Sequence, residues 1–105
     1  LVVGDVFASI GFKTRVTGYS KDGGIDVILD GPNGKTIGVQ VRHSKNRIQV
    51  EPVRALSGAL MEHGHYAGIF VTTSDFTAGA RDHANVMASR GMPVSLMNAD
   101  RFYQA

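Results

Sequence analysis

The sequence predicts an α/β domain in which a mixed central β-sheet is flanked by helices. Two segments that read as strands surround the turn sequence Gly-Pro-Asn-Gly at residues 31–34, a pattern typical of a β-hairpin. Residues 66–72 form a continuous apolar run, as expected of a central strand covered on both faces. Helical patterns separate the later strands, and such β-α-β crossovers add parallel strands to a sheet.

The composition is that of one folded domain. The chain has 105 residues, 43% of them hydrophobic and 19% charged, which is typical of a globular rather than a disordered protein. No apolar run approaches the roughly 18 residues that cross a bilayer. The absence of cysteine excludes disulfides and cysteine-based zinc sites or nucleophiles. Because the chain begins inside an apolar segment and not at methionine, we expect a fragment of a longer protein.

The first half of the chain predicts one helix and three strands. Residues 1–10 have helical spacing, and Gly11 is a suitable helix C-cap. Residues 18–24 form a loop whose glycines can adopt positive φ and let the backbone approach a ligand closely. Alternation predicts a strand at residues 12–17, and the two segments of the hairpin predict strands at residues 25–29 and 35–43.

The second half predicts helices that alternate with strands. Residues 44–49 are polar and are expected to be flexible. A helix is predicted over residues 50–63. Its apolar face should consist of Val53, Leu56, Leu60 and Met61, and two small residues, Gly58 and Ala59, should allow close packing. After the strand at residues 66–72, Thr73 or Ser74 should cap a helix over residues 76–90. The remaining elements are a strand at residues 93–97 and a terminal helix at residues 99–104, which Asn98 can cap.

Three polar side chains of the hairpin suggest a site for phosphodiester chemistry. Asp26 lies on the first strand, and Gln40 and Arg42 lie two residues apart on the second, where they share a face. Val39 and Val41 alternate with them and should point into the core. Mg²⁺ prefers oxygen ligands, and a cation can meet the negative charge that develops during hydrolysis. The alternative is a cross-strand ion pair between Asp26 and Arg42, with Gln40 as a polar surface residue.

Positive charge is concentrated beside the hairpin, although the formal net charge is only +2. A short stretch contains five basic residues, opposed mainly by Glu51, and these are Lys35, Arg42, Lys45, Arg47 and Arg54. Such a patch suits phosphate binding. The alternative is a solvated strand end followed by a helix start.

Other polar residues have more ordinary explanations. Asp22 could add a carboxylate to a metal site, but an aspartate before two glycines more often forms a turn. The hydroxyls of residues 72–74 could contact phosphate, although capping the next helix is their commoner role. Residues 62–65 contain a glutamate and two histidines but lack a second cluster, which favours a surface helix end over a zinc site.

Several segments resemble the catalytic domain of Mrr-type restriction endonucleases, within the PD-(D/E)xK nuclease group. They are G-F-x-x-x-V-T-G at residues 11–18, D-G-G-I-D-V at 22–27, V-Q-V-R at 39–42, V-R-A-L-x-G-A-L at 53–60 and G-I-F-V-T-T-S-D-F-T at 68–77. Together they cover most of the chain, in order. The resemblance implies a restriction-endonuclease-like fold and a magnesium-dependent DNA endonuclease.

The resemblance also implies roles for particular residues. Asp26 matches the family's metal-binding aspartate, and Gln40 matches the glutamine of its Q-x-K motif. Arg42 stands where the family has lysine, so the positive charge is kept but the group cannot release a proton near neutral pH. Lys45 is a candidate replacement for that lysine. The glutamate common on the family's first helix has no counterpart here.

We therefore expect residues 1–105 to be the catalytic domain of a type IV-like restriction endonuclease, with Mg²⁺ or Mn²⁺ held by Asp26 and Gln40. Arg42 would stabilise the transition state. Double-stranded DNA, including methylated DNA, would be gripped by His43, Lys45, Arg47 and Arg54. A homodimer would cut both strands in a bacterial or archaeal cytoplasm, and another domain would recognise the sequence, since phosphate contacts carry no base information. The alternative is an impaired domain that binds DNA or a protein without cutting, because Arg42 replaces the lysine.

Overall fold

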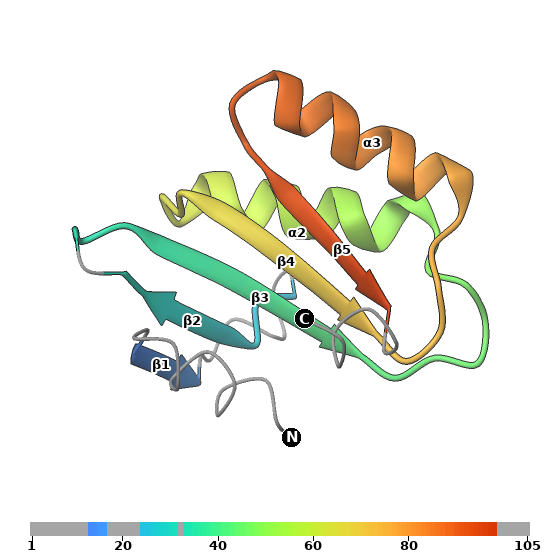
Figure 1. Ribbon diagram of the computed structural model, residues 1–105, viewed down its shortest axis with the longest axis horizontal. Coiled ribbons are helices and arrows are strands. Elements are labelled where there is room, and N and C mark those ends of the chain that lie inside the picture. Colours follow the sequence, from blue (N-terminus) through green and yellow to red (C-terminus); the bar gives the residue numbers. More distant parts are fainter. Residues whose placement is uncertain (1–12, 17–23, 32, 99–105) are drawn as a thin grey trace.

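The computed structural model describes residues 13–16, 24–31 and 33–98, which form five strands and two helices (Figure 1). Each element begins within two residues of its predicted start. The helices predicted at residues 1–10 and 99–104 lie outside the described residues. In chain order the elements are β1 (Lys13–Val16), β2 (Val27–Asp30), β3 (Thr36–Arg42), α2 (Val50–Glu62), β4 (Ala67–Thr72), α3 (Ala78–Ser89) and β5 (Val94–Asn98).

The strands form one mixed sheet in the order β1-β2-β3-β4-β5, which confirms the predicted architecture. The pairs β1–β2 and β2–β3 are antiparallel, whereas β3–β4 and β4–β5 are parallel. The β2–β3 turn is closed by the Gly31 N–H, which donates to the carbonyl of Lys35 at 2.8 Å. Gly34 has a φ of +74°, a conformation that favours glycine. Because β3, β4 and β5 are paired in parallel, their carboxyl ends lie at the same edge of the sheet.

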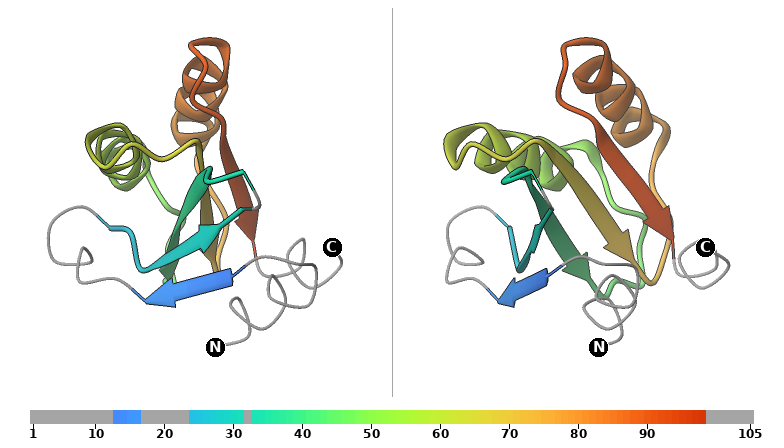
Figure 2. Two further views of the ribbon diagram at one scale, coloured as in Figure 1. Left: turned by 90° about the vertical axis from the view of Figure 1, so that its left-hand side faces the viewer. Right: turned by 60° about the vertical axis from the view of Figure 1, so that its left-hand side comes forward.

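Both described helices cover one face of the sheet, as the views in Figures 1 and 2 agree. On this face the side chains of α2 and α3 pack with Ile28 of β2, Phe70 of β4 and Val94 of β5 in the larger apolar cluster. Strand residues of opposite parity form a second cluster on the other face, and its buried members are Leu29, Val39, Ile69 and Val71. β4 contributes to both clusters, as predicted for a central strand.

Close approach between α2 and the sheet depends on two strand glycines rather than on the helix glycine. Gly38 and Gly68 are paired on β3 and β4, and a Cβ atom at either would collide with Leu60 of α2. The predicted role of Gly58 is wrong, since nothing lies within 4 Å of the Cβ position there. Met61 was also expected on the buried face but is 63% exposed, because it follows Leu60 directly and points about 100° away around the helix.

The start of α3 differs from the prediction. Its N-cap is Thr77, whose Oγ1 accepts from the N–H of Ala80 at 3.2 Å, and not Thr73 or Ser74. The reason is that Phe76 keeps an extended backbone and forms an isolated parallel bridge with Ile48. The chain can turn into a helix only after this bridge.

In the part of the chain that the structure describes, neither helix has the length and apolar character needed to span a bilayer.

Candidate functional site at the carboxyl ends of the parallel strands

Asp26 is fixed against β3 by two hydrogen bonds. Its N–H donates to the carbonyl of Val39 at 2.8 Å, and its Oδ2 accepts from the N–H of Val41 at 2.9 Å. Extending the β2–β3 register by one residue places Asp26 opposite Gln40, and directly opposed residues share a face of an antiparallel pair. The carboxylate is therefore held beside the amide of Gln40, with one of its two oxygens already engaged by backbone.

Gln40 is buried, with only 7% of its surface exposed. It lies on the face that α2 and α3 cover, whereas Val39 and Val41 face the second apolar cluster, as their alternation predicts. Its Nε2 donates to the carbonyl of Val41 at 3.4 Å. Its Oε1 is buried and has no hydrogen-bond partner among the described residues. The alternative of a surface glutamine is wrong.

Gly24 makes room for the Gln40 amide. Its φ is +88°, and a Cβ atom built there would overlap Gln40 Oε1. Sequence reasoning expected the glycines of residues 18–24 to admit a ligand, and the structure shows that this one admits a side chain from the neighbouring strand. The doubled glycine before Ile25 was the available signal. Asp22 lies outside the described residues.

The oxygens of Asp26 and Gln40 fit a hard divalent cation. An anionic carboxylate beside a buried amide oxygen that lacks a described partner is the donor set that Mg²⁺ or Mn²⁺ prefers. No three His, Cys, Asp or Glu side chains gather as a metal site anywhere in the described ranges, so water, phosphate or backbone oxygens would complete the coordination. His65, weighed above for zinc, is buried and its Nδ1 lies 2.7 Å from Thr36 Oγ1 at the opposite end of β3.

Arg42 ends β3 and is exposed. Its Cζ lies 6.0 Å from the ring centroid of Phe70, which is buried and meets Phe76 edge to face. Within the described residues no salt bridge joins Arg42 to Asp26, so the cross-strand ion pair of the alternative interpretation does not form. The guanidinium lies beyond Gln40 on the same face, which leaves it accessible to an anion.

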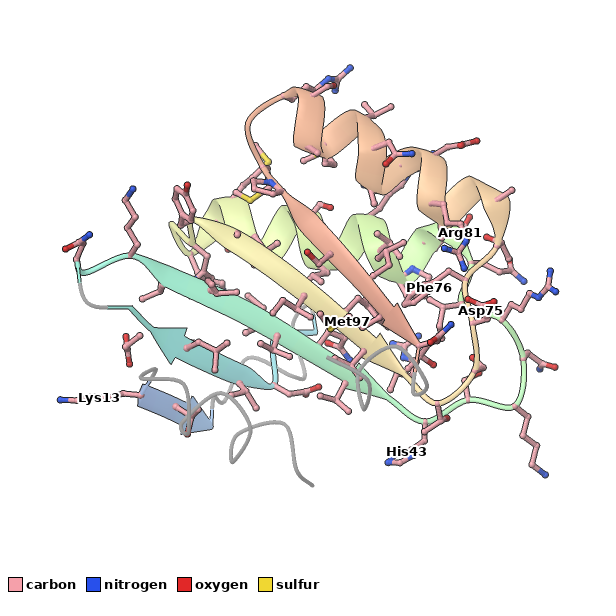
Figure 3. The ribbon with its side chains drawn as sticks, in the orientation of Figure 1. Lys13, His43, Asp75, Phe76, Arg81 and Met97 are labelled. Atoms are coloured by element: carbon pink, nitrogen blue, oxygen red, sulfur yellow. The ribbon has the colours of Figure 1, made fainter. Side chains whose placement is uncertain are left out.

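Three of the four residues predicted to contact DNA lie on the loop that follows β3. His43, Lys45 and Arg47 are all exposed. In Figure 3, His43 directly follows the end of β3 and points away from the protein. Since β3 has ended at Arg42, Lys45 is not bound by strand alternation.

Arg54 is separate from this loop. It is exposed on α2, and its charge acts on His83 of α3. Burial, followed by the charges of Arg54 and Arg90, lowers the pKa of His83 below its usual range. His83 Nε2 lies 3.2 Å from Ser57 Oγ, which donates to the carbonyl of Val53. The structure thus associates Arg54 with the α2–α3 interface.

Residues 72–74 neither cap α3 nor present free hydroxyls. Thr72 is buried, and its Oγ1 lies 3.1 Å from Ser74 Oγ. Thr73 and Ser74 bond to the loop after β3. Asp75 accepts from the N–H of Phe76 at 2.8 Å and forms a 2.6 Å salt bridge with Arg81, and these contacts, with the backbone bond foremost, lower the pKa of its carboxyl.

Comparison with known proteins places this geometry in a family. The family model of the Mrr catalytic domain, described as a restriction endonuclease, matches residues 1–105. The chain is 34% identical over 92 residues to the uncharacterized protein y4cE of Sinorhizobium fredii, and 33% identical over 91 residues to the type IV methyl-directed restriction enzyme EcoKMrr of Escherichia coli. These alignments cover 83% and 80% of this chain but only 24% and 30% of the relatives.

Two solved structures share the fold. The protein of unknown function AF1548 superposes with a TM-score of 0.71 at 15% identity, over 90% of this chain and 53% of that one. The MspJI restriction endonuclease, solved in complex with a 27-mer oligonucleotide, superposes with a TM-score of 0.59 at 22% identity, over 99% of this chain and 26% of that one. With the family match extending over its whole length, the chain belongs to the Mrr-type restriction endonuclease family.

Proposed function

We propose that the domain hydrolyses DNA phosphodiester bonds with the help of Mg²⁺ or Mn²⁺, as a restriction-type endonuclease. The observation that carries this proposal is the pairing of the Asp26 carboxylate with the buried Gln40 amide, whose Oε1 has no partner among the described residues. Leaving a buried acceptor without a hydrogen bond costs about 1–3 kcal/mol, so a ligand that uses Oε1 would offset a cost already present in the fold.

In this proposal each residue has a distinct task. Asp26 and Gln40 would hold the cation, which when bound would polarise the phosphate and lower the pKa of a coordinated water. The hydrogen bond from Val41 fixes the carboxylate of Asp26 before substrate arrives. Arg42, exposed beyond the metal ligands, neutralises the charge that develops on the phosphate oxygens. The face of the Phe70 ring lies against the guanidinium, in a cation–π arrangement.

The substrate we propose is double-stranded DNA, and the oligonucleotide bound to MspJI and the methyl-directed activity named for EcoKMrr support DNA, including methylated DNA. His43, Lys45 and Arg47 are exposed on the loop that directly follows β3, the strand that carries Gln40, and would contact backbone phosphates, with Arg54 on α2 as a further contact. Two copies would act together to cut both strands, in a bacterial or archaeal cytoplasm. Residues beyond the part shared with the longer relatives would recognise the sequence.

A second function follows from Arg42. Because guanidinium cannot give up its proton near neutral pH, a mechanism that needs a lysine to activate or orient water would fail here. The domain would then bind DNA, or another protein, without cutting it. The same surface residues would serve both functions, so only a cleavage measurement separates them.

The test is cleavage of supercoiled plasmid with Mg²⁺ or Mn²⁺. We expect the parent to nick DNA and Asp26→Asn to lower the rate by about 100-fold or more. Asp30→Asn, at the opposite end of β2, is the matched control and should retain activity. A silent parent that Arg42→Lys restores would mean a site disabled at one position. If the parent and Arg42→Lys both bind DNA but neither cleaves it, the second function is established instead.

A further inference from the structure

The parallel ladder between β3 and β4 is continued beyond its last pair by a side chain. The register ends with Arg42 opposite Thr72, and the N–H of Thr73 then donates to the carbonyl of Arg42 at 3.3 Å. Thr73 Oγ1 accepts from the N–H of Ser44 at 3.0 Å and donates to the carbonyl of Ser44 at 3.4 Å. One hydroxyl thus occupies both backbone groups of Ser44, as the backbone of a neighbouring strand would.

Two more contacts hold the same loop downstream. Ser74 Oγ donates to the carbonyl of Asn46 at 2.8 Å. The N–H of Ile48 donates to Asp75 at 2.8 Å, and the N–H of Thr77 donates to Ile48 at 3.0 Å. Residues 43–48 are therefore anchored near their start, middle and end by residues 73–77.

The anchored loop also has an internal turn. Ser44 Oγ donates to the carbonyl of Asn46 at 2.6 Å and lies 3.2 Å from its N–H. This turn and the outer anchors leave Lys45 and Arg47 exposed on either side of Asn46. The hydroxyls of Thr73 and Ser74 have donated their hydrogens inside the protein, so they cannot donate to a phosphate.

We propose that Thr73 and Ser74 are positioning residues for DNA: they hold the loop of residues 43–48 so that His43, Lys45 and Arg47 form a preorganised phosphate-binding surface. The inference rests on the proposed function and deepens it. An immobilised loop loses less conformational freedom when it binds, so its basic side chains contribute more affinity than they would on a flexible loop. The two hydroxyls act through the loop and do not touch the substrate.

The experiment measures binding of the full chain to a short fluorescent DNA duplex in EDTA, over a series of salt concentrations. We expect Thr73→Val and Ser74→Ala each to weaken binding about three- to tenfold, the range that one or two lost hydrogen bonds would produce. Thr73→Ser keeps the hydroxyl and should bind DNA with the affinity of the parent. Ser89→Ala also removes a hydroxyl that donates to backbone, at the far end of α3, and should bind as the parent does.

A double-mutant cycle separates positioning from general stability. If Thr73 positions Lys45, the affinity lost through Lys45→Ala should be smaller in the Thr73→Val background than in the parent. Additive losses, or unchanged affinity in both Thr73→Val and Ser74→Ala, would overturn the inference while leaving DNA binding intact. A parent that does not bind DNA would overturn the inference together with the function on which it rests. Thermal unfolding of each variant identifies losses that come from unfolding, and Ser74→Ala decides the case if Thr73→Val does not fold.

Discussion

The two ends of β3 are closed by loops of different construction. At its amino end the turn from Gly31 to Lys35 is closed by local backbone bonds and by Gly34 in the left-handed region. At its carboxyl end residues 43–48 are held by hydroxyls and backbone groups of residues 73–77, which lie about thirty positions away in the sequence. The first loop serves chain reversal, whereas the second presents exposed basic side chains directly after the strand that carries Gln40. A loop fixed from a distance is thus the stronger indication of function.

Glycines near the two ends provide the largest expected contrast. Gly24 and Gly34 have φ values of +88° and +74°, so alanine at either should cost about 1–2 kcal/mol of stability. At Gly24 the new Cβ would also displace Gln40, whereas nothing lies within 4 Å of that position at Gly34. We expect Gly24→Ala to lower plasmid cleavage on the order of 100-fold and Gly34→Ala to leave cleavage nearly unchanged.

Urea unfolding should be measured beside cleavage for these two variants. Equal activity in two folded proteins would show that the placement of the Gln40 amide does not matter for hydrolysis.

Lysines at the two ends provide the next contrast. Lys45 lies on the anchored loop, whereas Lys35 beside the turn places its Nζ 4.4 Å from the ring centroid of Tyr66. Lys45→Ala should weaken DNA binding to all sequences alike and reduce the slope of log affinity against log salt by about 1. Lys35→Ala should change neither quantity. The reverse result in a salt titration would move the DNA surface to the opposite end of β3.

The smallest expected effect concerns acid stability. The pKa of Asp75 lies below its ordinary value of 3.8, chiefly because the N–H of Phe76 bonds its carboxylate. A lowered carboxyl pKa stabilises the fold above pH 3.8, and this contribution is lost as the pH falls through the lowered value. Asp75→Asn should therefore flatten the loss of stability at acid pH, as measured by chemical unfolding. Asp82→Asn, on the exposed surface of α3, is the control and should follow the parental curve.

Patterns within one segment were sufficient to predict most of the described fold. The apolar run of β4 and the start of α2 at Val50 depend on neighbours in sequence, and both were located to within one residue. The start of α3 was misplaced because the bridge between Ile48 and Phe76 joins segments that are distant in sequence. The loop at residues 44–49 was expected to be flexible because its residues are polar. That expectation failed because this loop forms hydrogen bonds with residues 73–77, which are distant in sequence.

The candidate site divides in a similar way. Strand alternation and hairpin pairing predicted that Asp26 and Gln40 would lie together, and the register agrees. Alternation cannot reveal which face the helices cover, so the burial of Gln40 was not foreseen. The closeness of Gly24 to that amide was missed because it requires the backbone path of two segments at once.

The paired glycines beneath α2 have a consequence for how this domain can evolve. Gly38 and Gly68 face each other across β3 and β4, and Leu60 fills the space that their missing side chains leave. A larger residue at either glycine requires the Leu60 side chain to move, and a smaller residue at position 60 would remove the collision. These positions should therefore change together among descendants of this sequence, so that a substitution harmful in one lineage is neutral in another.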